Sequence, residues 1–206
     1  MLIIGLTGSI GMGKSTAAAR FRSHGIAVFD ADAAVHRLYA GKAVPLIEAA
    51  FPGTTNSVSK TVDRPLLAAA LIADPSGFKR LEAIVHPLVQ AEQREFLQEQ
   101  AAAGADMAVL EIPLLLETGG EARVDIVVVV SAPPDVQRQR VLARPGITEE
   151  RLQSLLARQM PDAEKRAKAH FVVDTSGTIE ASQAQIDTII AKLRGRPGTA
   201  LERHWS

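Results

Sequence analysis

The chain has 206 residues, of which 47% are hydrophobic and 22% charged, a composition typical of a globular domain. Its 23 basic and 23 acidic residues give a net charge of zero, which argues against nucleic acid as the main partner. The absence of cysteine excludes disulfides and thiol catalysis. No apolar run approaches the roughly 20 residues that span a membrane, and no basic stretch opens the chain as in a signal peptide, so we expect a cytoplasmic protein without a membrane partner.

The first predicted element is a strand over residues 2–7, followed by a glycine-rich loop and a helix. The loop, Gly8-Ser9-Ile10-Gly11-Met12-Gly13-Lys14-Ser15, fits the phosphate-binding pattern G-x-x-x-x-G-K-[ST]. Glycine allows backbone N–H groups to converge on phosphate oxygens, and the helix directs its positive end at the anion. We expect Lys14 to reach the β- and γ-phosphates and the Ser15 hydroxyl to bind Mg²⁺. The alternative, a glycine-rich turn without function, is much less favoured because the full pattern stands between a strand and a helix.

A second apolar strand over residues 26–29 ends in Asp30-Ala31-Asp32. In open α/β sheets, ligands bind beyond the carboxyl ends of the strands, so these carboxylates are candidate ligand-binding residues. Either aspartate alone is as readily explained as the cap of the helix that follows. The two together, beside a phosphate loop, favour a functional role.

Residues 42–106 separate the second strand from the third and are predicted to be mainly helical, with helices over 45–51, 63–72 and 74–103. This segment is far longer than a usual connection from a strand, and we interpret it as an insertion that could cover an acceptor substrate. It contains His86, and a lone histidine on a helix is more often a structural hydrogen-bonding group than a catalyst.

Two further strands are predicted over residues 107–112 and 125–130, the second with the unbroken β-branched run of a buried parallel strand. Glu111 lies near the end of the first, and Glu117 follows in the loop after Pro113. Each glutamate is a candidate metal or substrate ligand, and each is equally well explained as a surface or capping carboxylate.

Helices over residues 133–144, 149–160 and 162–168 are predicted next, with Pro145-Gly146 between the first two. They carry Arg138, Arg140, Arg144, Arg151 and Arg158. Any single arginine is better explained as a solvated charge paired with nearby acids. The set favours a mobile lid that brings positive charge onto a transferring phosphate.

A fifth strand over residues 171–174, a turn and a helix over 179–193 complete the predicted domain. Short apolar strands that alternate with helices predict an α/β fold with a five-stranded parallel sheet and helices on both faces, while the strand order stays open. We expect one domain over 1–194, comprising a helical substrate subdomain (42–106), a lid region (138–169) and a core (1–41, 107–137 and 170–194). Residues 195–206 are predicted to form a mobile tail.

Three classes of phosphate-loop protein are compatible with this fold: a small-molecule kinase, a GTPase switch and an ATP-driven motor. Asp174-Thr175-Ser176-Gly177 fits the D-x-x-G pattern of a GTPase, but it follows the last strand, and no Asn-Lys-x-Asp segment is present. A motor would need a longer chain, a basic surface or an acidic strand-end pair after a hydrophobic run. A nucleotide-binding regulator would fit the loop but leaves Asp32 and the lid unexplained. The kinase is therefore favoured.

Several segments, in this order along the chain, carry a family resemblance. They are residues 6–16, Asp30-Ala31-Asp32, His86-Pro87-Leu88, Pro113-Leu114-Leu115-Leu116-Glu117, the helix with Gln137-x-x-Arg140-x-x-x-Arg144, Gln159, and the turn Val173-Asp174-x-x-Gly177. Together they resemble the dephospho-coenzyme A kinase family over nearly the whole chain. The loop alone is shared by many families, whereas the ordered combination is specific.

The resemblance implies a P-loop kinase-type fold with a helical acceptor-binding insertion and a short helical lid. It implies an enzyme that uses ATP and Mg²⁺ to phosphorylate the ribose 3′-hydroxyl of dephospho-coenzyme A, the last step of coenzyme A biosynthesis. The implied catalytic residues are Asp32, as proton acceptor, with Lys14, Arg140 and Arg144. The implied ATP-binding residues are Gly8, Gly11, Met12, Gly13, Lys14, Ser15, Thr16, Thr175 and Gly177. The implied acceptor-binding residues are Asp30, Asp32, His86, Pro113, Leu115 and Glu117.

The chain departs from the family pattern at three positions. The family often has an acidic residue where His170 stands, an asparagine where Thr175 stands and an acidic lid residue where Pro145 stands. These departures affect the expected base contacts near Thr175 and the expected stiffness of the lid hinge. A kinase for nucleoside monophosphates or a shikimate-like acceptor, or an NTPase switch, is the alternative, and we expect a monomer or weak homo-oligomer.

Overall fold

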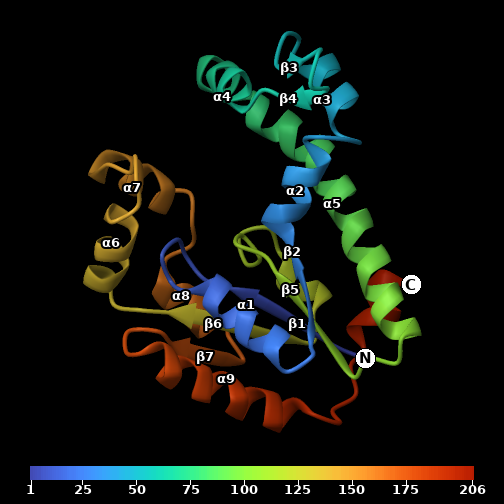
Figure 1. The fold of residues 1–206 in the computed structure, drawn as a ribbon, viewed down its shortest axis with the longest axis vertical. Coiled ribbons are helices and arrows are strands. Elements are labelled where there is room, and N and C mark those ends of the chain that lie inside the picture. Colours follow the sequence, from blue (N-terminus) through green and yellow to red (C-terminus); the bar gives the residue numbers. More distant parts are fainter. The chain divides into compact units, whose positions relative to one another are not determined.

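The computed structural model describes residues 1–206, which form two compact units (Figure 1). The first unit contains residues 1–30 and 97–206, and the second contains residues 31–96. None of the helices is both long and apolar enough to cross a membrane.

The first unit is built on a five-stranded sheet in which all strand pairings are parallel. Its strand order is β2-β5-β1-β6-β7, with β1 in the middle. The strands are β1 (Leu2–Thr7), β2 (Ala27–Asp30), β5 (Met107–Glu111), β6 (Ile126–Ser131) and β7 (Phe171–Asp174). Because the strands are parallel, their carboxyl ends share one edge, and the glycine loop leaves the sheet at the centre of that edge.

Both faces of the sheet are buried, which explains the unbroken valine run of β6. Val128 and Val130 pack in one core cluster with residues of α1 (Lys14–Ser23) and α9 (Ile179–Leu193). Val127 and Val129 point to the opposite face, where they pack with Leu115 and Leu116. The short helix η1 (Gly120–Arg123) follows that loop, and α8 (Asp162–Ala167) contacts β6. The predicted α/β fold with helices on both faces is confirmed.

Two helices of the predicted lid region connect β6 to α8. These are α6 (Pro134–Leu142) and α7 (Glu149–Leu156), which contact each other. An exposed ion pair of 2.8 Å joins Arg138 Nη2 to Glu149 Oε2 across them. The Thr148 hydroxyl accepts the N–H of Arg151 and so caps α7.

The second unit is helical around a small core of its own. Its elements are α2 (Ala31–Leu38), α3 (Val44–Ala50), the antiparallel pair β3 (Thr55–Asn56) and β4 (Thr61–Val62), α4 (Arg64–Ala73) and most of α5 (Gly77–Ala102). Leu38 of α2 packs with Ile47, Phe51 and Leu67, so the compact unit begins at residue 31 and not at the predicted residue 42. The two-residue strands are too short to leave an alternating pattern, and they lie between the helices that the sequence predicts over 45–51 and 63–72.

The C-terminal residues pack onto the first unit, whereas the sequence predicts a mobile tail over 195–206. Asp125 accepts the N–H groups of Thr199 and Ala200 with Oδ1 (2.7 and 2.9 Å) and that of Ile3 with Oδ2 (2.8 Å). Trp205, at the end of a helical turn over Leu201–Trp205, is 3% exposed, and its indole N–H donates to the Arg123 carbonyl. The expectation of a mobile tail is therefore wrong. The sequence did not indicate this packing, because a single tryptophan after a Pro-Gly break gives no periodic signal.

An ionic cluster connects α1 to α9. Asp187 of α9 accepts hydrogen bonds of 2.6 and 2.7 Å from Arg20 and lies 2.8 Å from His24 Nε2. The hydrogen bond from Arg20 is the main cause that lowers the pKa of Asp187 to about 2. The pair therefore stabilises the fold fully above the unfolded-state pKa of about 3.9, and this contribution is lost as the pH falls through about 2.

We predict that Asp187→Asn lowers the thermal unfolding temperature at pH 7, because it removes the charge paired with Arg20. The difference from the wild type should shrink between about pH 4 and pH 2, as the wild-type carboxylate takes up its proton. Thermal melts followed by circular dichroism at a series of pH values measure this difference. A difference that is the same at pH 7 and pH 2 would contradict the assignment.

Candidate functional site

The glycine loop between β1 and α1 has a backbone that only glycine accommodates. Gly11 and Gly13 have φ angles of +78° and +86°, in the left-handed region that side chains disfavour. A Cβ on Gly8 would lie 2.6 Å from the carbonyl oxygen of Val130, and one on Gly11 would lie 2.5 Å from Val141 Cγ2. The side chain of Met12 is buried, and its sulfur accepts the Ala132 N–H. Only the backbone of Met12 is therefore available to a ligand at the loop.

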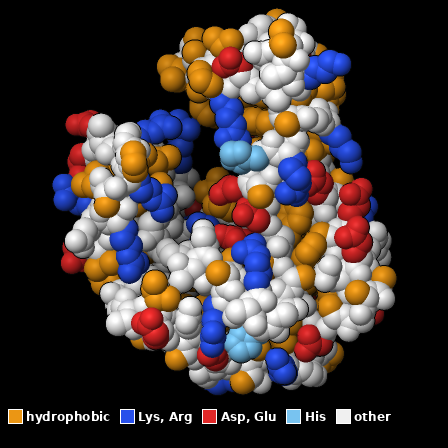
Figure 2. Space-filling model, in the orientation of Figure 1, with side chains coloured by type: hydrophobic (Ala, Val, Ile, Leu, Met, Phe, Trp, Pro, Cys, Tyr) orange, Lys and Arg blue, Asp and Glu red, His pale blue; other side chains and the backbone are white.

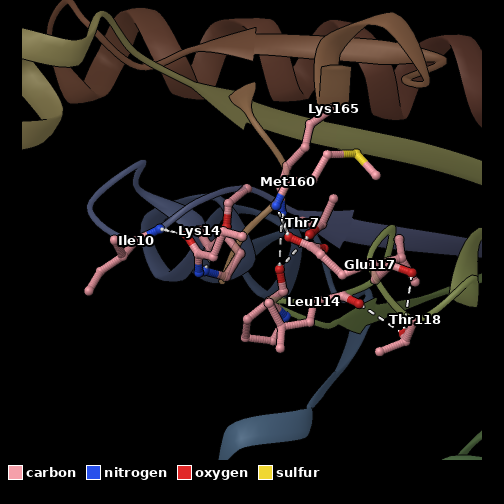
Figure 3. A network of polar contacts seen from close by, with 12 residues as sticks. Thr7, Ile10, Lys14, Leu114, Glu117, Thr118, Met160 and Lys165 are labelled. Atoms are coloured by element: carbon pink, nitrogen blue, oxygen red, sulfur yellow. Dashed lines mark hydrogen bonds and ion pairs between the residues drawn. The ribbon is translucent and has the colours of Figure 1, made fainter. Parts of the chain in front are cut away.

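The first turn of α1 has neither a side-chain cap nor an acidic residue to offset the positive end of the helix. Its N-cap is Gly13, which has no side chain to accept a hydrogen bond, and no acidic residue stands in the first turn. Lys14 folds back over the loop, where its ammonium donates to the Gly8 carbonyl at 3.2 Å (Figure 3). Ser15 and Thr16 are exposed. These features suit an anion such as phosphate.

Two glutamine side chains form hydrogen bonds with the backbone of one residue, Ile10, at the tip of the loop. The side-chain amide of Gln137, buried on α6, donates to the Ile10 carbonyl at 2.8 Å. The side-chain oxygen of Gln159 accepts the Ile10 N–H at 3.1 Å. Ile10 occupies a variable position of the motif, so the pattern itself assigns these glutamines no role. Both glutamines belong to the segments that carry the family resemblance, which gives neither a role. The position of Gln137 on the inward face of a predicted helix is a further signal of its contact.

Thr175, in the turn after β7, is buried against the loop. Its hydroxyl lies 3.0 Å from the Met12 carbonyl and 3.2 Å from the Ser131 carbonyl, so it can donate its one proton to either. Arg140 donates to both the hydroxyl and the carbonyl oxygen of Thr175. The structure thus brings Thr175 and Arg140 together at the loop, although the sequence predicts them as a base contact and a lid charge. Gly177 is exposed in the same turn.

The other predicted lid arginine is in a different environment. Arg144 is exposed beyond the end of α6, next to Pro145-Gly146. Basic side chains gather on the face of the molecule over α6 and α7, on the left of Figure 2. Arg138, Arg144 and Arg151 are all exposed in these elements. The predicted lid region therefore carries exposed positive charge, while Arg140 bonds to Thr175 in the turn after β7.

The segment from Pro113 to Glu117, here called the acceptor loop, follows β5 and is fixed by polar contacts. The Pro113 carbonyl accepts the Thr7 hydroxyl at 3.1 Å. Glu117 Oε1 accepts the Met160 N–H at 2.8 Å and lies 2.7 Å from the ammonium of Lys165 (Figure 3). Leu115 is fully buried in the core, so its side chain anchors the loop.

The remaining candidate residues lie at or after strand ends. Asp30 ends β2 and is paired in register with the buried Glu111, which ends β5. Asp32 is exposed in the first turn of α2, and His86 is exposed on α5, both in the second unit. No group of three His, Asp or Glu side chains is arranged to hold a metal ion.

The sequence matches the family model described as dephospho-CoA kinase over residues 2–181. A relative of that name from Mesorhizobium japonicum is 57% identical over 199 residues, which cover 97% of this chain and 100% of the relative. The chain belongs to the dephospho-CoA kinase family.

Solved structures agree with this family membership. A protein from Thermus thermophilus has a TM-score of 0.80 and 38% identity, covering 94% of this chain and 98% of that chain. A dephospho-CoA kinase from Campylobacter jejuni has a TM-score of 0.71 and 25% identity, covering 93% of this chain and 96% of that one. The family match includes the glycine loop, Gln137, Gln159 and Thr175, so the contacts at the loop fall within the shared domain.

We predict that the two lid arginines differ in what they contribute to stability. Arg140→Ala should lower the free energy of unfolding by about 1.5–3 kcal/mol, because it removes two charge-assisted hydrogen bonds to Thr175. Arg144→Ala, at an exposed position, should change it by less than about 0.5 kcal/mol. Urea unfolding of both variants provides the comparison. Equal losses would show that the Arg140 contacts with Thr175 do not stabilise the fold.

Proposed function

We propose that this chain transfers the γ-phosphoryl group of ATP to the ribose 3′-hydroxyl of dephospho-coenzyme A, giving coenzyme A and ADP, the last step of coenzyme A biosynthesis. The observation that carries the proposal is a phosphate loop whose tip is fixed by Gln137 and Gln159, in a chain of this family. Both substrates are small soluble molecules, so we propose a cytoplasmic enzyme that acts as a monomer or weak homo-oligomer.

The donor site consists of the loop backbone, Lys14 and the start of α1. Gly8, Gly11 and Gly13 allow the N–H groups to converge on the phosphates, and Lys14 adds a full positive charge. Because Lys14 bonds to the Gly8 carbonyl, its ammonium is held over the loop that binds the phosphates. Thr175 and Arg140 support the loop from the side on which we place the adenine.

At this site the protein would supply few of the ligands of a magnesium ion. The exposed Ser15 hydroxyl at the start of α1 is the residue that would hold it, together with phosphate oxygens and water, which is how Mg²⁺ commonly binds beside a nucleotide. When bound, the ion would offset negative charge on the β- and γ-phosphate oxygens.

We propose that Asp32 orients the 3′-hydroxyl and takes its proton. Its carboxylate is exposed directly after the carboxyl end of β2, where ligands bind in such sheets. The bond from O3′ to the γ-phosphorus forms, the bond from that phosphorus to the β–γ bridging oxygen breaks, and the hydroxyl proton passes to Asp32. The proposed acceptor site also contains Asp30, His86, Pro113, Leu115 and Glu117.

The proposed lid supplies charge and excludes water. Arg144 is exposed beside Pro145-Gly146, where the chain can bend, so we propose that it reaches the phosphoryl group when the lid closes. Arg140 would act with it while it holds Thr175. Exclusion of water matters because water competes with the 3′-hydroxyl for the phosphoryl group.

The proposed reaction is tested by ADP release with a panel of acceptors: dephospho-coenzyme A, nucleoside monophosphates, shikimate and water. We expect strong release only with dephospho-coenzyme A. Strong ADP release with another acceptor would show that the chain is a different small-molecule kinase. ADP release with water alone would show that it is an NTPase.

We predict that Asp32→Asn keeps the wild-type unfolding temperature but loses about 100-fold or more in kcat, because the proton acceptor is gone. Asp135→Asn, at an exposed position in the first turn of α6, is the matched control and should keep full activity. Steady-state kinetics and thermal melts check both variants. Wild-type turnover in Asp32→Asn would refute the role of Asp32.

We predict that Lys14→Ala loses about 100-fold or more in kcat/KM, because charge stabilisation at the phosphates is lost. The exposed Lys79→Ala, on α5, serves as control and should match the wild type. If Lys14→Ala had unchanged kinetics, the glycine loop would not be the catalytic nucleotide site.

A further inference from the structure

Lys165, on α8, is a charged residue whose location the reaction does not explain. It is 0% exposed. Removing an ammonium group from water is costly, and apolar side chains commonly stabilise such a position as well or better. A buried lysine is therefore better explained by what it positions than by what it adds to stability.

The ammonium group of Lys165 contacts both ends of the acceptor loop. It lies 2.7 Å from Glu117 Oε1 at one end and 3.4 Å from the Pro113 carbonyl at the other. The Pro113 carbonyl also accepts the Thr7 hydroxyl, at the end of β1. Lys165 thus ties the acceptor loop to the end of the strand from which the phosphate loop begins (Figure 3).

Glu117 connects this contact to the phosphate loop through two consecutive residues. Its Oε1 accepts the Met160 N–H at 2.8 Å, and the preceding residue, Gln159, accepts the Ile10 N–H. The other oxygen of Glu117, Oε2, is buried and makes no hydrogen bond within the protein. Lys165 is therefore the charge that compensates Glu117, and without it the carboxylate would be driven to rotate toward water. That rotation would release Met160 and the end of the acceptor loop together.

We propose that Lys165 is a positioning residue that, through Glu117, sets the acceptor loop relative to the phosphate loop. This inference rests on the proposed function, because the acceptor loop is part of the proposed site for dephospho-coenzyme A. Lys165 does not touch the reacting atoms. It fixes the path that runs from Pro113 and Glu117 to Met160, Gln159 and Ile10.

Three variants test the proposal. Lys165→Met leaves Glu117 without its charge partner, Glu117→Gln keeps a side-chain acceptor for Met160 but removes the ion pair, and Lys165→Met with Glu117→Leu removes both charges. Lys168→Met is the matched control, because Lys168 is the C-cap residue of α8 and forms an exposed ion pair of 3.3 Å with Glu121. Each protein is assayed well below its unfolding temperature, with dephospho-coenzyme A and ATP varied separately and ATP binding measured by calorimetry.

We expect all three variants to lose about tenfold or more in kcat/KM for dephospho-coenzyme A, while Kd for ATP stays within about twofold of the wild type. The double variant should regain the unfolding temperature that Lys165→Met loses, because no unpaired buried charge is left, yet it should keep the acceptor defect. Lys168→Met should match the wild type in every constant.

The proposal is overturned if the double variant regains both stability and the acceptor constant, because the pair would then serve folding alone. It is also overturned if any folded variant of the three keeps the wild-type acceptor constant, or if none of them folds. If the wild type itself does not phosphorylate dephospho-coenzyme A, the proposed function fails instead, and the wild-type assay alone separates that result from failure of the Lys165 proposal.

Discussion

The phosphate loop can reverse direction between β1 and α1 only because its backbone carries so little side-chain bulk. A single methyl group on Gly8 or Gly11 would overlap with β6 or α6. Neighbouring elements approach the loop closely for this reason, and they fix it at Ile10 through Gln137 and Gln159 and at Met12 through Thr175. The loop is therefore held by side chains from α6, from the segment after α7 and from the turn after β7.

This shaping suits the chemistry of phosphoryl transfer, which depends mostly on positioning and on neutralising charge. The loop backbone and Lys14 supply fixed positive potential at the centre of the sheet edge. The acceptor loop leaves the neighbouring strand β5 at the same edge, and Thr7 and Lys165 both bond to its Pro113 carbonyl. Contacts from β1 and α8 thus connect the loop that we propose binds the donor to the one that we propose binds the acceptor.

Local features of the sequence were sufficient to predict much of this fold. The strand, loop and helix around Gly8–Ser15 follow from a motif whose chemistry is contained within a few residues, and the five core strands follow from short apolar runs between helices. The strand order, the start of the second unit at residue 31 and the burial of Trp205 depend on contacts between distant segments. Periodicity contains no information about such contacts.

In the candidate site, too, local features could be predicted from the sequence, whereas contacts between distant residues could not. Pattern and resemblance predicted the glycine loop and Lys14, and the structure adds that Arg140 bonds to Thr175 and that Gln137 holds Ile10. Lys165 has the sequence surroundings of a solvated residue in a charged helix, and only the fold reveals that it is buried against Glu117.

In the proposed reaction, the phosphoryl group goes from ATP to one particular hydroxyl of dephospho-coenzyme A. Phosphorus–proton correlation NMR of the purified product locates the new phosphate directly. We predict a phosphate on the ribose 3′ oxygen, with one ADP formed for each product molecule. A phosphate on any other hydroxyl, or ATP consumed without a phosphorylated acceptor, would contradict it.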